Sequence, residues 1–170
     1  MNPPQYILQP VRPWFIIVSL LTALLLNLLP WGRLPGVPDV LAVVLLYWNL
    51  HQQRRVGIGA AFLLGIVMDV QDASLLGEHA LAYTLLAFGA ITLQRRVTPL
   101  PRLLQALHLL PLLVGAQLVP FLIRVLVAGR FPGWAYLIDG FVEALIWPIV
   151  STLLIAPQKR AVDRDDTRPI

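Results

Sequence analysis

The chain has 170 residues, of which 58% are hydrophobic and only 13% are charged, and its formal net charge is +4. Soluble domains contain about 45–50% apolar and about 25% charged residues, so a soluble globule of this length cannot bury so much apolar surface. No segment is long and polar enough to form a separate soluble domain, which argues against an attached ATPase, kinase or DNA-binding module. We expect a single domain over residues 1–170.

Six apolar segments follow one another along the chain, and each is a candidate transmembrane helix. A helix needs about 20 apolar residues to cross a hydrocarbon core of about 30 Å, and a backbone in lipid must satisfy its own hydrogen bonds. We therefore predict an all-α membrane protein built as a bundle of six transmembrane helices. The segments are Trp14–Leu29, Val37–Leu50, Val56–Val70, His79–Leu93, Leu104–Ala128 and Trp134–Ala156, and a disordered cytoplasmic tail follows over residues 157–170.

The first two segments differ from the others. The first resembles a signal peptide, with Arg12 ahead of an apolar run, but no small-x-small cleavage site follows it. We interpret it as an uncleaved anchor. The second is short, although Leu41–Trp48 is fully apolar, and it lies between Asp39 and His51. It either crosses the membrane where the protein is thin or enters the membrane and returns.

The basic residues predict the orientation. With six spans and a cytoplasmic N-terminus, the cytoplasmic side holds Arg12, Arg54, Arg55, Arg95, Arg96, Arg102, Lys159, Arg160, Arg164 and Arg168, and the outside holds Arg33 and Arg130. This bias follows the positive-inside rule and places the C-terminus in the cytoplasm. If the second segment does not cross, Arg12 and Arg33 exchange sides and the bias is unchanged. We favour six spans, because the apolar run at 41–48 would otherwise have to be shielded from water in another way.

Four ionisable residues lie at membrane depth, toward the outer ends of their spans: Asp69, Arg124, Asp139 and Glu143. Such residues are costly in lipid and usually face the interior of a bundle or water. We propose them as an intramembrane polar network. One interpretation is a polar pocket open to the outside, in which Arg124 pairs with Glu143 or Asp69. A structural ion-pair or interface role is favoured over a pocket for a ligand or a partner.

Small residues recur every four positions at the start of the third segment, at Gly57, Ala61 and Gly65. They form one flat helix face, which suits close packing against another helix. The Gly57-x-Gly59 start lacks the third glycine and the preceding strand of a dinucleotide-binding motif, so we expect no cofactor. Packing inside the chain is favoured over packing against a partner's single span.

Other chemistry finds no support in the residue pattern. The histidines do not have metal-ligand spacing, and His79 is expected to be solvated at a span end. No serine lies in a nucleophile-elbow context, and the chain has no cysteine. We predict that the protein is not an enzyme and needs no metal. The basic residues separate apolar segments, so they indicate orientation rather than nucleic-acid binding.

Several short motifs, in order, resemble the MreD family of bacterial rod-shape proteins. They are Pro38-Asp39 before the apolar run 41–48, the Arg-Arg pair followed by Gly57-x-Gly59, Gly65-x-x-x-Asp69, and Leu76-Gly77-x-His79-Ala80-Leu81. Each motif alone is weak, but their order and spacing together are fairly specific. Chain length and six-span hydropathy agree with the resemblance, which covers almost the entire chain.

The resemblance implies a non-enzymatic component of the bacterial inner membrane and of the rod (elongation) complex. It implies that the chain binds MreC and so helps to couple MreB filaments to peptidoglycan synthesis by RodA and a class B penicillin-binding protein. It also implies a fold like the six-helix substrate-binding subunits of energy-coupling-factor transporters. The alternative function is a small-molecule, vitamin-type transporter or its substrate-binding subunit, motivated by the outer polar cluster and by prolines within the last two segments.

Overall fold

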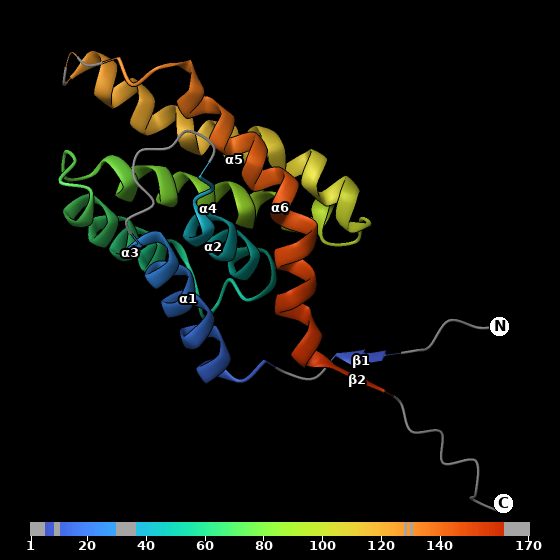
Figure 1. The fold of residues 1–170 in the computed structure, drawn as a ribbon. Coiled ribbons are helices and arrows are strands. Elements are labelled where there is room, and N and C mark those ends of the chain that lie inside the picture. The colour runs from blue at the N-terminus through green and yellow to red at the C-terminus, as the bar shows by residue number, and fades with distance from the viewer. Residues whose placement is uncertain (1–5, 9–10, 30–36, 128, 130, 162–170) are drawn as a thin grey trace, which may run out of the picture.

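The computed structural model describes residues 6–8, 11–29, 37–127, 129 and 131–161. The predictions made for Arg33, Arg130 and residues 162–170 fall outside these ranges. Within them, six α-helices follow one another at the predicted places, so the helical part of the predicted fold is confirmed (Figure 1). They are α1 (Pro13–Asn27), α2 (Val40–His51), α3 (Ile58–Gln71), α4 (Glu78–Val97), α5 (Arg102–Leu126) and α6 (Ile138–Ile155).

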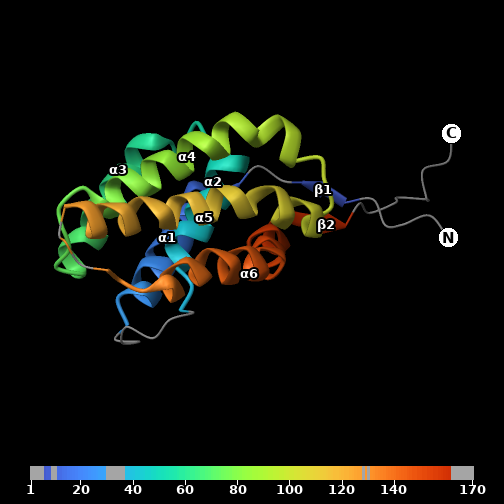
Figure 2. The same ribbon diagram turned by 90° about the horizontal axis from the view of Figure 1, so that it is seen from above.

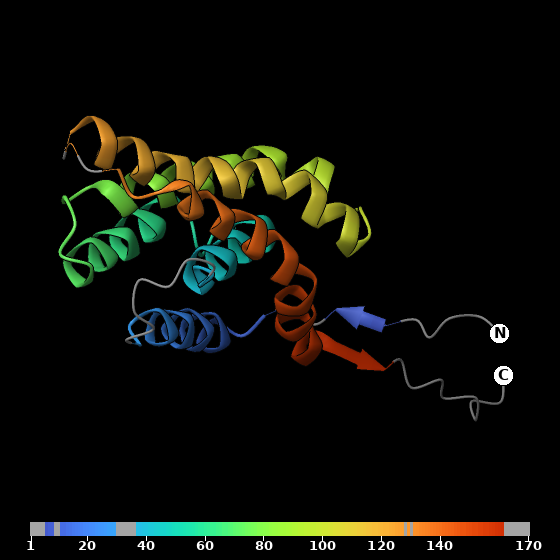
Figure 3. The ribbon, with the colours of Figure 1, turned by 45° about the horizontal axis from the view of Figure 1, so that its top comes forward.

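Two 3₁₀ turns flank α6, namely η1 (Trp134–Leu137) and η2 (Ala156–Gln158). Strands β1 (Tyr6–Leu8) and β2 (Lys159–Ala161) pair antiparallel, with Tyr6 opposite Ala161 and Leu8 opposite Lys159. The sequence predicts no strand, and it predicts disorder from residue 157. The even number of helices brings the two ends of the described chain side by side, where these short strands pair (Figure 3). The disordered tail stays a prediction.

Consecutive helices run antiparallel, so the bundle has two different ends. At one end α1, α3 and α5 finish and α2, α4 and α6 begin, and all six acidic residues of the described chain lie there: Asp39, Asp69, Asp72, Glu78, Asp139 and Glu143. We call it the acidic end. The opposite, basic end carries β1, β2 and the exposed residues Arg12, Arg54, Arg55, Arg95 and Arg96.

Helix α2 is the core of the bundle. Each residue from Leu41 to Leu50 is buried, as expected for a helix that is apolar on every side. The helix packs against α1, α4 and α6 (Figure 3). Its 12 residues span only about 18 Å at 1.5 Å per residue. The apolar run 41–48 is therefore covered by protein, and its burial no longer argues by itself for a membrane crossing.

Helices α3 and α5 lie outside this core and pack against α4. Helix α4 packs against α3 on one side and α5 on the other, and α5 packs against α6 (Figure 2). Among the described helices, Arg102–Leu126 and Ile138–Gln158 are long and apolar enough to cross a membrane by themselves, and less than half of each is buried by the protein. Helices α1, α2 and α3 are apolar but shorter.

Candidate functional site

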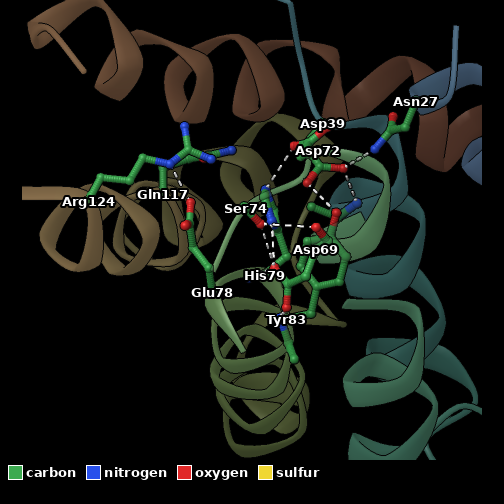
Figure 4. Close-up of polar contacts among 12 residues, drawn as sticks. Asn27, Asp39, Asp69, Asp72, Ser74, Glu78, His79, Tyr83, Gln117 and Arg124 are labelled. Carbon is green, nitrogen blue, oxygen red and sulfur yellow. Dashed lines mark hydrogen bonds and ion pairs between the residues drawn. The ribbon is translucent and has the colours of Figure 1, made fainter. Parts of the chain in front are cut away.

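Polar side chains from five of the helices meet at the acidic end (Figure 4). They form three groups: the surroundings of the Asp69 carboxylate, a cluster that joins Asp39 to Glu143, and an ion pair between Arg124 and Glu78. The sequence places the same region at the outer ends of the spans. The structure adds how these side chains are connected.

Asp69, in the last turn of α3, accepts hydrogen bonds from the first turn of α4. Its Oδ2 accepts from the backbone nitrogens of Gly77 (2.8 Å) and Ala80 (3.4 Å), and its Oδ1 accepts from the backbone nitrogen of His79 (2.6 Å). The Ser74 hydroxyl donates to Oδ1 at 3.2 Å, and Nδ1 of His79 lies 2.9 Å from it. Free N–H groups at a helix N-terminus attract an anionic oxygen, so Asp69 caps α4 from the neighbouring helix.

Gly65 and Gly77 make this cap geometrically feasible. A Cβ atom at Gly65 would lie 2.6 Å from the backbone nitrogen of Ala80 and 2.7 Å from the carbonyl oxygen of His79. Only glycine lets α3 and α4 approach so closely. Gly77 has φ of +105°, a conformation that favours glycine. The two motifs Gly65-x-x-x-Asp69 and Leu76-Gly77-x-His79-Ala80 therefore form the two sides of one helix hairpin.

Asp39 is the centre of the second group. Its Oδ1 caps α2 by accepting from the backbone nitrogen of Ala42 at 2.9 Å, and it also accepts from Nδ2 of Asn27 at 2.6 Å. The Tyr83 hydroxyl donates to Oδ2 at 2.6 Å. Asn27 in turn accepts from the backbone nitrogen of Val40 at 3.1 Å. Asp39 thus holds the N-terminus of α2 to α1 and α4.

Glu143 extends this group to α5 and α6. It is fully buried, and its Oε1 accepts from Nε2 of Gln117 at 2.5 Å and from the backbone nitrogen of Asp39 at 3.4 Å. Its Oε2 has no hydrogen-bond partner among the described residues. No described arginine, lysine or histidine pairs with it. Within the described ranges, Glu143 is therefore a buried carboxyl group without a cation.

Arg124 pairs with Glu78, which corrects the predicted pairing with Glu143 or Asp69. Its Nε donates to Oε1 of Glu78, whose side chain is buried, and its guanidinium lies 5.0 Å from the ring centre of Tyr136. The sequence predicts Glu78 at the same end of the spans as Arg124 but outside the fourth span. The structure includes Glu78 in α4, as its first residue, and so brings it within reach of α5.

The other predicted residues are placed as follows. Asp139 is half-buried, one turn before Glu143 on α6. Gly57 is the N-cap of α3, and Ala61 and Gly65 are buried along that helix, Gly65 against α4. His79 is buried beside Asp69, so its predicted solvation is wrong. No group of three or more metal-ligating side chains occurs within the described ranges.

Sequence reasoning missed Asn27, Tyr83 and Tyr136. Each lies near the end of an apolar segment, where an amide or a phenol is ordinarily read as an interfacial side chain. A usable signal exists for Asn27, which is the last residue of α1. An amide at a helix end beside an Asp N-cap on the next helix can serve both the cap side chain and the free N–H groups.

Comparison with known proteins identifies the family of the chain. The family model described as "rod shape-determining protein MreD" matches residues 9–156, which include all six helices. The chain belongs to the MreD family. A Haemophilus influenzae protein named "Rod shape-determining protein MreD" is 32% identical over 153 residues, which cover 88% of this chain and 92% of that protein. No solved structure matches the chain.

MreD membership confirms the resemblance predicted from the ordered motifs and gives the chain a role in bacterial cell shape, within the rod complex. MreD proteins are membrane-associated structural proteins and are not known as an enzyme family. The hairpin formed by α3 and α4 contains the most recognisable of these motifs. Its contacts show that those residues build the fold.

Proposed function

We propose that all six helices form one multi-pass domain of the bacterial inner membrane, which serves as a scaffold of the rod complex. The observation that carries this proposal is the apolar outer surface. Exposed large apolar side chains occur along every helix except α2, among them Trp14, Leu21, Leu25, Phe62, Leu63, Val70, Phe88, Leu107, Leu126, Leu145, Ile149 and Leu153. Soluble monomers rarely expose apolar surface on this scale. Such a surface suits lipid and partner helices.

The positions of the two chain ends support a cytoplasmic N-terminus. Strands β1 and β2 pair at the basic end, so both ends of the described chain leave the bundle on one side (Figure 3). The positive-inside rule assigns that side to the cytoplasm. Helix α2 runs between the two ends with α1, α4 and α6 packed against it, so its short length does not have to match the thickness of the lipid. The acidic end then faces outward.

Single cysteines can test this orientation, because the chain has no cysteine of its own. Leu29→Cys, after α1, should react with a membrane-impermeant maleimide from outside. If α2 does not cross and the N-terminus is outside, this position lies in the cytoplasm and does not react with the reagent. Exposed Leu76 should label from outside and exposed Gln53 only after permeabilisation in either case, so they are matched controls. Labelling of Leu29→Cys only after permeabilisation would overturn the six-span topology.

We further propose that the chain holds MreC through contacts between helices, and so couples MreB filaments to RodA and a class B penicillin-binding protein. A groove between α4 and α5 offers a suitable surface, since it is lined by Leu85, Leu86, Pro111, Leu112, Gly115 and Ala116. Small residues let a second helix approach closely in lipid. A Cβ atom at Gly115 would contact nothing within 4 Å. The predicted face at Gly65 is already occupied by α4.

Gly115→Trp tests the groove without disturbing the bundle, because the site is open. We expect this variant to reach normal abundance in the membrane and to lose co-purification with MreC. Leu145→Trp, at an exposed position of α6, is the control and should retain MreC. Equal retention of MreC by both variants would mean that MreC binds to another surface of the bundle.

The role in the complex has a direct cellular test. Depletion of this protein should round rod-shaped cells, and expression of the intact chain should restore rods. Normal rods after clean deletion, in a host with no second copy, would contradict the proposal. The Gly115→Trp and Leu145→Trp variants should differ in this assay as they differ in MreC binding.

The fold of energy-coupling-factor substrate-binding subunits stays a prediction from the resemblance, and so does the transporter alternative. At the acidic end, Arg124 is bonded to Glu78 and Gln117 to Glu143. Internal bonds of this kind favour the scaffold. Thermal stabilisation of the purified protein by members of a vitamin panel would instead favour a transporter.

A further inference from the structure

A hollow on the outer surface of the basic end combines apolar and cationic groups. It is lined by Pro13, Ile16 and Ile17 from the first turns of α1 and by Arg55 from the loop between α2 and α3. The side chain of Ile17 is about half exposed. The hollow is thus open to the surroundings of the bundle, with an apolar wall and one charged group.

Arg55 is held in place at this hollow. Its Nη1 donates to the carbonyl oxygen of Val11 at 2.7 Å, just ahead of α1. A guanidinium group carries five N–H donors, so this bond leaves others for a ligand. The neighbouring Arg54 and the residue before α1, Arg12, are also exposed. No acidic residue of the described chain lies at this end.

The depth of the hollow follows from the proposed membrane domain, on which this inference rests. Trp14 is 72% exposed and shares a helix face with Ile17. An exposed tryptophan at a span end marks the level of the lipid headgroups. Arg55 then lies at the level of the phosphates, whereas Ile16 and Ile17 lie nearer the acyl chains.

We infer that this hollow is a binding site for one anionic phospholipid of the cytoplasmic leaflet, with its phosphate at Arg55 and an acyl chain along Ile16 and Ile17. The positive charge of Arg55 favours an anionic lipid as the ligand. Arginines near a membrane surface favour anionic over zwitterionic lipids, because a zwitterionic headgroup brings its own cation. The apolar wall distinguishes a lipid from free phosphate, which makes no use of Ile16 or Ile17. Arg55 can bind two oxygens of one phosphate at once.

The test is native mass spectrometry of the purified full chain, titrated with phosphatidylglycerol, phosphatidylcholine or inorganic phosphate. We expect one retained phosphatidylglycerol, little phosphatidylcholine and no competition by inorganic phosphate. Arg55→Gln should weaken phosphatidylglycerol retention by about fivefold. Arg96→Gln removes an equal charge from an exposed position at the end of α4 and should leave retention unchanged.

A second pair of variants tests the apolar wall and keeps Arg55 intact. Ile17→Trp should fill the hollow and reduce retention, whereas Leu21→Trp, one turn further along the exposed face of α1, should not. Equal loss in both members of either pair would overturn the inference, and so would equal retention of the two lipids. Extraction of the protein from membranes by alkaline carbonate would refute the membrane domain itself. Loss of lipid selectivity in a membrane-embedded protein refutes only the lipid site.

Discussion

Two carboxylate groups at the acidic end, Asp69 and Glu143, are both buried but are stabilised in different ways. Asp69 accepts three backbone N–H groups and the Ser74 hydroxyl, all from residues 74–80. Glu143 accepts from Gln117 on α5 and from the backbone of Asp39 before α2, and one of its oxygens has no partner among the described residues. The hydrogen bonds of Asp69 come from nearby residues of the chain and use both carboxyl oxygens. Those of Glu143 come from residues far apart in the sequence and use only one of its oxygens.

These two sets of hydrogen bonds have different structural roles in the bundle. The Asp69 cap fixes the angle and spacing of the α3–α4 hairpin, which can form from residues close in sequence. The Asp39–Glu143 cluster joins α1, α2, α4, α5 and α6, so it can form only when the bundle assembles. Damage to the hairpin should therefore lower stability more than neutral replacement of Glu143.

The largest effect is expected at Gly65, because its neighbours are backbone atoms that cannot move aside. Gly65→Val should lower the free energy of unfolding by at least about 3 kcal/mol, since added atoms in a packed interior force the helices apart. The midpoint of thermal unfolding in detergent is the measurement. Gly59→Ala is the control, because a Cβ atom there meets nothing within 4 Å. A tolerated Gly65→Val would refute the close approach of α3 and α4.

Removal of the cap itself should have the next largest effect. Asp69→Ala leaves the backbone nitrogens of Gly77, His79 and Ala80 without their acceptor, and unsatisfied buried donors of this kind should cost about 3 kcal/mol together. Asp72→Ala is the matched control. The Asp72 side chain is 44% exposed and its Oδ2 lies 3.6 Å from Nε2 of His79, so its loss should cost less than about 1 kcal/mol. Equal melting temperatures for the two variants would contradict the role of Asp69 as the cap of α4.

The local contacts of the hairpin could be predicted from the sequence more easily than the long-range cluster. The six helices were predictable, because each apolar segment is bounded by polar residues, glycine or proline. The hairpin motifs were recognisable because Gly65, Asp69, Gly77 and His79 lie close together in the chain. Their shared role as the two sides of a cap required the structure. Sequence spacing gives the face of a helix but not the distance to the next helix.

The long-range cluster could not be predicted for a physical reason. Arg124 has several carboxyl groups at its end of the bundle, and only the packing of α5 beside α4 selects Glu78 as its partner. The central place of α2 was also missed. A short helix that is apolar on all sides can lie in lipid or inside a protein, and composition alone does not separate these two surroundings.

Loss of Arg124 would leave Glu78, like Glu143, as a buried carboxyl group with no cation partner among the described residues. Arg124→Leu should lower stability by about 2 kcal/mol, less than for a fully buried pair because the Arg124 side chain is 27% exposed. The double variant Arg124→Leu, Glu78→Gln should recover part of this loss, since no unpaired charge then remains. A ligand site would behave differently: Arg124→Leu would leave stability intact and abolish binding.

The smallest effect is expected for the neutral replacement of Glu143, and it tests the comparison most finely. Glu143→Gln keeps the size of the side chain and an oxygen that can accept from Gln117 and from the backbone nitrogen of Asp39. It removes an ionisable group that has no cation partner in the described bundle. Replacement of a buried ionisable group that lacks compensation is often neutral or stabilising, so unfolding should change by less than about 1 kcal/mol in either direction. Glu143→Ala, which loses both hydrogen bonds, should destabilise more. A large loss in Glu143→Gln would mean that the charge itself is needed, and that a cation outside the described residues supplies the missing partner.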